Sequence, residues 1–293
     1  MEFDEYIEAL DQAGVSYKLN QPLAQYGGYG SGGNAAVMVF PENLNQIKAA
    51  CRFKHETIGN GTNVLFSDYG YDGAIINVRE MNAVRVSGVS VRAECGATLA
   101  MVREAAEMSC LGGLEFTEGI PATIGGAVCM NAGCFSKSVG DLIAYVITDK
   151  CAYNRVNCNF DYRSSRFSCG NDGEKEVIAE ACFLLKPSES DIIQAKKEKY
   201  KRMRKNSQPH GKSCGSVFLN DGSFAGKLID LAGLKGIKTG GARVSEKHAN
   251  FIINEGGSSS DVYALIKLIK KQVLKVHGVN LKEEIKYIGK FDD

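Results

Sequence analysis

The sequence lacks the spacing patterns that hold a metal ion. It has 10 cysteines, but none forms a Cys-x-x-Cys pair, and the closest two are Cys129 and Cys134. Its 4 histidines are scattered along the chain at His55, His210, His248 and His277. Structural zinc sites need closely spaced cysteines and histidines. We therefore expect no metal, and we expect the cysteines to be free thiols that fill small volumes in the core.

A membrane span, a signal peptide and a strong net charge are also missing. The uncharged segment from Ile120 to Phe135 has 16 residues, whereas a membrane helix needs about 20. The first residues, MEFDEYIEAL, are acidic and place Phe3, Ile7 and Leu10 on one helical face, unlike a secretory signal. The net charge is +1, which gives no general preference for nucleic acid or membranes. We expect a cytoplasmic protein that neither inserts into membranes nor binds nucleic acid.

The pattern of elements is that of an α+β protein. Apolar alternation predicts strands between about Ala36 and Pro187, with few helices among them. We expect these strands within the following ranges: 34–41, 56–78, 84–96, 139–149, 153–162 and 176–187. We expect helices in four further ranges: 43–53, 98–111, ended by Gly112 and Gly113, 190–208, and 260–277, ended by Gly278. The last helix should bury one apolar face, formed by Val262, Leu265, Ile266, Ile269, Val273 and Val276.

Two glycine-rich segments suggest a large cofactor. The stretch GLEFTEGIPATIGGAVCMNAGCF begins at Gly113, and a second glycine turn runs from Gly59 to Asn63. Clustered glycines usually mean unusual φ and ψ angles or close approach of the backbone to a ligand. Exposed backbone N–H groups can cradle a pyrophosphate. A buried core strand in GGAVCM is the alternative.

A third glycine segment does not fit a Rossmann site. Gly28, Gly30 and Gly33 form a Gly-x-Gly-x-x-Gly match, but a strand pattern follows it where a helix is required. Farther along, 7 of the 10 residues from Lys196 to Lys205 are basic. They indicate a solvated helix face or, alternatively, a contact between Arg204 and a phosphorylated substrate. Residues 207–215 are typical of a domain linker.

Seven motifs in order resemble the MurB family of UDP-N-acetylenolpyruvoylglucosamine reductases. They are GNGTNVLFSD, GLEFTEGIPATIGGAVCMNAG, DYRSSRF, QPHGKSCGSVF, AGKLIDLAGLKG, SEKHANFIIN and LKEEIKYIG. The interval from Arg163 to Ser216 is short, as in the type II branch. The chain departs from the family pattern around Gly27–Gly30, at Ala122 and at Cys134-Phe135-Ser136. Phe135 has no hydroxyl with which to bind a substrate.

The resemblance implies a multi-domain FAD-binding fold of the PCMH/VAO type with a C-terminal α/β substrate-binding domain. The expected domains are 1–85 and 86–190, which bind FAD, and 191–293, which binds the UDP-sugar. It implies a flavoprotein oxidoreductase that uses non-covalent FAD and NADPH to make UDP-N-acetylmuramate for peptidoglycan. Cell wall biogenesis, cell shape and cell division depend on that product. We expect a monomer whose partner is the small-molecule UDP-sugar.

The resemblance also assigns roles to individual residues. Arg163 would stabilise negative charge, Ser216 would donate a proton, and Glu284 would assist if its pKa is raised. Without the motifs, these would be an ordinary surface arginine, a turn serine and a solvated glutamate, and His248 stays structural. The substrate-binding candidates are Arg204, Gln208 and Asn220. The candidates for FAD are Gly59, Asn60, Gly61, Thr62, Asn63, Gly119, Ile120, Pro121, Thr123, Ile124, Gly125, Gly126, Asn131, Ala132, Gly133 and Ile178.

Three other functions remain open on the residues alone. A flavin-dependent oxidase would make peroxide instead of consuming NADPH, and residues 22–36 contain no histidine or cysteine for covalent flavin attachment. A degenerate flavin- or nucleotide-binding regulator would have lost catalytic residues that this chain retains. An RNA-binding basic helix would need aromatic side chains between its basic ones.

Overall fold

The computed structural model describes residues 2–169 and 175–292. The chain forms two compact units, and neither is a continuous stretch of sequence. Unit 1 comprises residues 1–18, 38–59 and 74–204, and unit 2 comprises residues 19–37, 60–73 and 205–293. The chain therefore passes repeatedly from one unit to the other. Our division into three consecutive domains stays a prediction.

The first elements follow the sequence pattern closely. Helix α1 (Phe3–Gln12) buries Tyr6 and Leu10, and Tyr6 donates a hydrogen bond to the Ala50 carbonyl of α2 (Leu44–Ala50) at 2.8 Å. A four-stranded sheet has the order β1-β2-β5-β3. Its strands are β1 (Ser16–Pro22), β2 (Asn34–Phe40), β3 (His55–Ile58) and β5 (Tyr71–Asn77). The unit boundaries fall within β1, β2 and β5.

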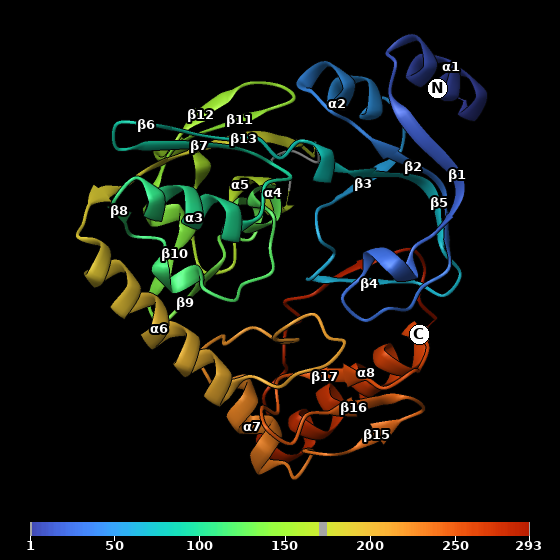
Figure 1. Ribbon diagram of the computed structural model, residues 1–293. Coiled ribbons are helices and arrows are strands. Elements are labelled where there is room, and N and C mark those ends of the chain that lie inside the picture. Colours follow the sequence, from blue (N-terminus) through green and yellow to red (C-terminus); the bar gives the residue numbers. More distant parts are fainter. Residues whose placement is uncertain (1, 170–174, 293) are drawn as a thin grey trace. The chain divides into compact units, whose positions relative to one another are not determined.

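An antiparallel sheet forms the centre of unit 1. Its strand order is β12-β11-β13-β7-β6. The strands are β6 (Val84–Ser87), β7 (Ser90–Glu94), β11 (Ile143–Thr148), β12 (Ala152–Asn154) and β13 (Ile178–Leu184). Helices α3 (Leu99–Met108) and α4 (Ile124–Cys129) pack against it (Figure 1). The second glycine segment contains α4 and therefore packs against this sheet.

Short elements connect these parts of unit 1, and one long helix follows them. The short strands are β8 (Leu111–Gly112), β9 (Gly133–Cys134), β10 (Lys137–Ser138) and β14 (Lys186–Pro187). The short helices are η2 (Val78–Glu80), η3 (Glu115–Thr117), η4 (Val139–Asp141), η5 (Val156–Cys158) and α5 (Arg166–Cys169). The long helix is α6 (Ser190–Ser207), as expected.

Unit 2 has its own hydrophobic core around α8 (Ser259–His277). Helix α8 runs beside the antiparallel sheet β15-β16-β17 (Figure 1). The other elements are η1 (Ala24–Tyr26), β4 (Val64–Phe66), α7 (Ala225–Leu231), β15 (Lys238–Thr239), β16 (Ala242–Val244), β17 (Ile252–Asn254) and β18 (Lys286–Ile288). Strand β4 pairs in parallel with β18. Segments distant in sequence therefore share one core.

Helix α8 confirms most of the expected apolar face. Val262, Leu265, Ile266, Ile269 and Val273 are buried. Val276 is 54% exposed, so its assignment to that face was wrong. A Ser258–Asp261 capping box begins the helix, and Gly278 ends it with a φ of +68°. No helix among the described residues is both long enough and apolar enough to cross a membrane.

Several expectations about local structure were wrong. Helix α3 ends at Met108, before the two glycines, because Cys110 itself adopts a φ of +52°. Residues 153–162 hold only the end of β12, followed by η5. Residues 207–215 are no linker: Lys212 pairs with Asn254 of β17, and Cys214 is buried in the unit 2 core. A main chain with such partners belongs to the folded unit.

The cysteines only partly follow the prediction. Among the nine that the structure describes, none forms a disulfide. Cys95, Cys158, Cys182 and Cys214 are buried and fill core volume as expected, whereas Cys110 and Cys151 are exposed. Burial raises the pKa of Cys95 and of Cys214 to about 12. These buried thiols are protonated at neutral pH and act as small apolar side chains.

Candidate active site

The two glycine segments predicted for FAD meet inside unit 1. Gly59 directly follows β3, and Thr123 directly precedes α4. A Cβ atom at position 59 would overlap the Thr123 hydroxyl and lie 2.8 Å from its Cγ2 atom. Real Cβ atoms do not approach other atoms so closely, so only glycine fits at this contact. The structure thus brings together two segments that the sequence analysis had connected only through a shared ligand.

The remainder of the first segment, Asn60–Asn63, lies in unit 2. Gly61 has a φ of +63°, and its carbonyl accepts a hydrogen bond from the Gly28 N–H at 3.0 Å. Asn63 donates from Nδ2 to the backbone carbonyl of Glu284 at 3.1 Å. A residue predicted to bind FAD therefore fixes the main chain of a residue predicted to be catalytic.

The second segment forms a short helix where we expected a loop or a core strand. Two N–H groups at the start of α4 have partners in the chain itself: Ile124 donates to Ala97 and Gly125 to Cys95, both at 2.8 Å. They are therefore not part of the expected anion cradle. Gly126 is exposed, and a Cβ atom there would have its nearest contact at 3.6 Å, with Thr123 Oγ1. The open side of this segment is at Gly126.

Asn131 connects the second segment to the DYRSSRF motif, which begins at Asp161. Its side chain donates to the Asp161 carbonyl at 2.8 Å and accepts from the Gly140 N–H at 2.9 Å. It is buried and has a φ of +43°. Two other candidates for FAD also have partners within the protein. The Ala132 N–H donates to the Ala127 carbonyl at 2.7 Å, and Ile178 begins the buried strand β13. These residues shape the segment through contacts with their own chain.

Arg163 sits in a tight turn. Asp161 and Ser164 exchange backbone hydrogen bonds of 3.0 and 3.2 Å, which leaves Tyr162 and Arg163 at the tip. Arg163 has a φ of +51°, in the region that favours glycine. Its guanidinium carbon is 5.4 Å from the centroid of the Tyr162 ring. The turn presents an arginine where a glycine would be less strained.

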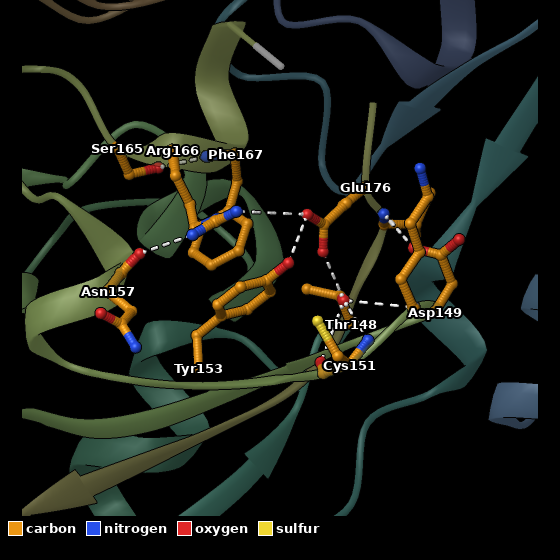
Figure 2. Close-up of polar contacts among 11 residues, drawn as sticks. Thr148, Asp149, Cys151, Tyr153, Asn157, Ser165, Arg166, Phe167 and Glu176 are labelled. Atoms are coloured by element: carbon orange, nitrogen blue, oxygen red, sulfur yellow. Dashed lines mark hydrogen bonds and ion pairs between the residues drawn. The ribbon is translucent and has the colours of Figure 1, made fainter. Parts of the chain in front are cut away.

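A polar network that the sequence analysis missed surrounds Arg166, three residues after Arg163 (Figure 2). Glu176 accepts hydrogen bonds from Tyr153 Oη at 2.6 Å and from Thr148 Oγ1 at 2.7 Å. The Arg166 guanidinium is 3.8 Å from Glu176 Oε1 and 3.8 Å from the Tyr153 ring centroid. Hydrogen bonding with the side chains of Cys151 and Glu176 raises the pKa of Tyr153. The phenol therefore stays protonated as a donor to Glu176.

Ser216 and Glu284 lie on adjacent segments of unit 2. The Glu284 N–H donates to the Val217 carbonyl at 2.7 Å, and Ser216 pairs with Phe251 on its other side. Both residues are half-buried. Gly215, which has a φ of +72°, precedes Ser216. The serine is thus fixed in the middle of three paired segments, with Glu284 beside it.

The three substrate-binding candidates have different surroundings. In unit 1, Arg204 donates from Nε to the Glu118 carbonyl at 2.7 Å and from Nη2 to Cys134 Sγ at 3.1 Å. In unit 2, Gln208 is half-buried, and exposed Asn220 accepts from the Ala225 N–H of α7 at 3.0 Å. Arg204 therefore supports the second glycine segment in addition to any contact with a substrate.

The expected solvated face of α6 is partly occupied by ion pairs. Lys197 lies 2.8 Å from Glu107 of α3, and Lys196 lies 3.8 Å from Glu115, which is 2% exposed. Arg103, also buried, lies 3.0 Å from Glu118 and 3.6 Å from Glu107. The i,i+4 spacing of Arg103 and Glu107 was the available sequence signal for this cluster. The cluster ties α6 and α3 to the residues just before Gly119.

His248 is structural, as expected. Its Nδ1 accepts from the Asn250 N–H at 3.3 Å, and its ring packs edge-on against Phe251 at 4.9 Å. Burial lowers its pKa. A cavity of about 250 Å³ also lies in unit 2, lined in part by Tyr69, Tyr263 and Lys267. No residue predicted for the active site lines it.

Family models and curated relatives match most of this chain. The family model for the C-terminal domain of UDP-N-acetylenolpyruvoylglucosamine reductase matches residues 207–288, and that for an FAD binding domain matches residues 35–148. The chain is 40% identical to the UDP-N-acetylenolpyruvoylglucosamine reductase of Caldicellulosiruptor bescii, covering 100% of this chain and 96% of that protein. It is 38% identical to the protein of the same name from Pediococcus pentosaceus, covering 92% and 93%.

A solved structure gives the same result for the fold. The crystal structure of MurB from Thermus caldophilus superposes with a TM-score of 0.82 at 30% sequence identity. The match covers 94% of this chain and 99% of that one. The predicted α+β FAD-binding fold with a C-terminal substrate domain is confirmed.

Proposed function

Because the chain belongs to the family of UDP-N-acetylenolpyruvoylglucosamine reductases, we propose that Arg163, Ser216 and Glu284 are its catalytic residues. The chain is an FAD-dependent oxidoreductase of peptidoglycan precursor synthesis. It reduces the enolpyruvyl group of its UDP-sugar substrate, with NADPH as the electron donor. The family thus defines the reaction, and the proposal concerns the residues that perform it.

The glycine segments fit FAD. Gly59 brings the first segment into contact with Thr123 of the second, and Gly126 is exposed where a Cβ atom would meet no atom beyond its own helix backbone closer than 3.6 Å. We propose that Gly59–Asn63 and Gly119–Gly126 hold the cofactor, together with Asn131–Gly133 and Ile178. Bound FAD supplies the hydride that is added to the terminal carbon of the enolpyruvyl double bond. The chain itself must then handle charge and a proton.

Hydride addition leaves an enolate of the substrate carboxylate. The fixed positive charge of Arg163 stabilises the developing negative charge. The Ser216 hydroxyl donates a proton to the carbon next to the carboxylate. Although a serine hydroxyl is a weak acid, an enolate is a strong base, so a weak donor is sufficient. Glu284, protonated or bridged by water, supports the carboxylate from the other side.

The observation that carries this assignment is the position of Ser216. It follows Gly215 and lies between its paired neighbour Phe251 and the segment that carries Glu284. A side chain anchored in this way loses little further freedom when a substrate arrives, which favours an accurately placed donor. We further propose that Arg204, Gln208 and Asn220 bind the UDP-sugar, and that the protein acts as a cytoplasmic monomer.

The test is anaerobic spectroscopy of the purified protein. We expect it to be yellow, to release flavin on heating or in acid, and to bleach with NADPH. The colour should return when the enolpyruvyl UDP-sugar is added. An oxidase would regain its colour with oxygen alone and release peroxide. A colourless protein that takes up no added FAD would contradict the proposal, and size-exclusion chromatography checks the expected monomer.

A further inference from the structure

The strained turn at Arg163 needs surroundings that hold it in place. Its φ of +51° lies in a region that residues with a Cβ atom rarely adopt. Such a conformation persists only where neighbouring contacts determine it, and it is found most often at functional sites. The contacts on both sides of the turn therefore bear on where the Arg163 guanidinium lies.

Hydrogen bonds between side chains and the main chain fix the two ends of the turn. Before it, the Asp161 carbonyl accepts from Asn131 Nδ2 at 2.8 Å. After it, buried Ser165 donates to the Cys129 carbonyl at 2.6 Å and accepts from the Phe167 N–H at 3.2 Å. These contacts locate the main chain. Helix α5 begins three residues after Arg163, and its Phe167 is held by the Cys129 thiol and by the Tyr153 ring.

Arg166, the first residue of α5, adds three contacts of its side chain (Figure 2). Its guanidinium lies over the Tyr153 ring, with 3.8 Å to the centroid. Nη1 donates to the Asn157 carbonyl at 2.9 Å, and Nη2 lies 3.8 Å from Glu176 Oε1. A planar guanidinium that stacks, donates and pairs at once has few other orientations.

Glu176, which lies just before β13, is the acidic partner of Arg166. Its two oxygens accept from Tyr153 and Thr148 (Figure 2), and its side chain is only 13% exposed. Arg166 is 19% exposed. Charges so far removed from water interact more strongly than surface pairs. The network therefore connects the central sheet, through β11 and β12, to the helix that follows the Arg163 turn.

We propose that Arg166, held by Tyr153 and Glu176, is a positioning residue for Arg163. The proposal rests on the proposed function, in which Arg163 stabilises the charge that develops on the substrate. A displacement of about 1 Å at a reacting centre can cost on the order of 100-fold in rate. The loss of the Arg166 clamp should therefore affect the step in which Arg163 acts, and not the steps before it.

The experiment separates positioning from general stability. The variants are Arg166→Ala, Tyr153→Phe, Arg163→Ala and the double variant of both arginines. The control is Arg92→Ala, because Arg92 also pairs with a glutamate of unit 1, Glu180, at 2.9 and 3.1 Å. Stopped-flow absorbance measures flavin reduction by NADPH and flavin reoxidation by the UDP-sugar as two rates. Hydrogen exchange of residues 161–168, measured without substrate, reports on the turn directly.

We expect Arg166→Ala to slow reoxidation by about 10- to 100-fold while reduction keeps the wild-type rate. Tyr153→Phe should act in the same direction with a smaller effect. In the Arg163→Ala background, Arg166→Ala should add nothing, because Arg166 acts through Arg163. Residues 161–168 should exchange faster in Arg166→Ala and unchanged in Arg92→Ala.

Other results would overturn the proposal. Equal slowing of both steps, or a full additional loss in the double variant, would make Arg166 a residue of general stability. If Arg163→Ala is slow and Arg166→Ala is normal, the inference fails and the proposed function stands. If Arg163→Ala reoxidises normally, the role of Arg163 and the inference fail together. Tyr153→Phe keeps the ring, so it decides the question if Arg166→Ala does not fold.

Discussion

Gly59 and Thr123 touch so closely that no other residue fits at position 59. A Cβ atom there would overlap the Thr123 hydroxyl. The contact joins two segments that share a glycine-rich composition but are far apart in sequence. It also distinguishes two kinds of glycine in these segments. Gly59 is required by the protein itself, whereas Gly126 leaves space that the protein does not use.

This distinction predicts the effect of Gly126→Ala. The substitution fits the fold, because the nearest atom to its Cβ would be Thr123 Oγ1 at 3.6 Å, and alanine is the better helix former. We expect an unchanged or slightly raised unfolding temperature and a weaker affinity for FAD, measured by titration of the apoprotein. Gly226→Ala is the control, since Gly226 also lies in the first turn of a helix and has ordinary contacts from 3.4 Å. Full FAD affinity in Gly126→Ala would mean that the cofactor does not approach this residue.

Ser216→Ala should separate the two half-reactions. Reduction of the flavin by NADPH needs no proton from Ser216, so its rate should stay normal. Reoxidation by the UDP-sugar needs the proton, and loss of a general acid typically costs about 10²- to 10⁴-fold. Ser216→Cys should retain more activity because a thiol also donates. Stopped-flow measurements of the flavin band check both steps. Equal slowing of both would identify Ser216 as structural.

Arg204→Ala should weaken FAD binding as well as substrate binding. The substitution removes the hydrogen bonds to the Glu118 carbonyl and to Cys134 Sγ, which hold the segment around Gly119. Loss of two charge-assisted hydrogen bonds should lower stability by about 2 kcal/mol or more. Arg202→Ala is the control, because Arg202 lies in the same helix and, among the described residues, its polar contact is one of 3.4 Å with the Glu198 carbonyl. Calorimetric unfolding and FAD titration provide the measurements. A rise in the KM for the UDP-sugar with unchanged FAD affinity would restrict Arg204 to the substrate.

Asp68→Asn should destabilise unit 2 in a pH-dependent way. The Asp68 carboxylate accepts hydrogen bonds from the N–H groups of Ser259 and Ser260 at 3.0 and 2.7 Å, and from Ser260 Oγ at 2.6 Å. Burial alone would raise the pKa of Asp68, but these hydrogen bonds outweigh it, so the pKa is lowered. Capping contacts of this kind contribute about 1 kcal/mol.

The sign of the pH dependence follows from the lowered pKa. The stabilisation by Asp68 is complete above the unfolded pKa of about 3.9 and is lost as pH falls through the lower folded value. Urea unfolding at neutral pH should therefore distinguish Asp68→Asn from wild type, and the difference should shrink in acid. Asp221→Asn is the control, since Asp221 forms an exposed pair with Lys282 and lies outside the helix caps of the described residues. A difference that does not change with pH would rule out the charge as its cause.

Local rules predicted local structure well. The apolar spacing of α8 identified its buried face, except at Val276, which lies at the last, exposed turn. The same rules failed where tertiary partners decide. Cys110 takes the left-handed conformation that we expected of a glycine, and Lys212 pairs with Asn254 in a segment that resembled a linker.

In the candidate active site, too, the sequence predicted local features but not contacts between distant residues. Glycine-rich composition was enough to predict close backbone approach in these segments, and the structure shows it where Gly59 packs against Thr123. The network around Glu176 could not be found in this way. Its partners Tyr153 and Thr148 are 23 and 28 residues away in sequence, and each is an ordinary strand residue in its own neighbourhood. Only the assembled sheet brings them to one carboxylate.

The interleaved chain of unit 2 has a consequence for synthesis on the ribosome. Its core joins Tyr29 and Leu65 to residues from Cys214 to Ile285, and β4 pairs with β18 near the end of the chain. The apolar side chains that the early segments 19–37 and 60–73 contribute to this core, such as Tyr29 and Leu65, therefore lack most of their partners until the last quarter of the protein has emerged. Contacts so distant in sequence are slow to form. Until they form, unpaired strands and exposed apolar side chains are prone to aggregate. We expect nascent chains that stop before residue 205 to bind chaperones through these two segments, while the contiguous stretch 74–204 can already fold.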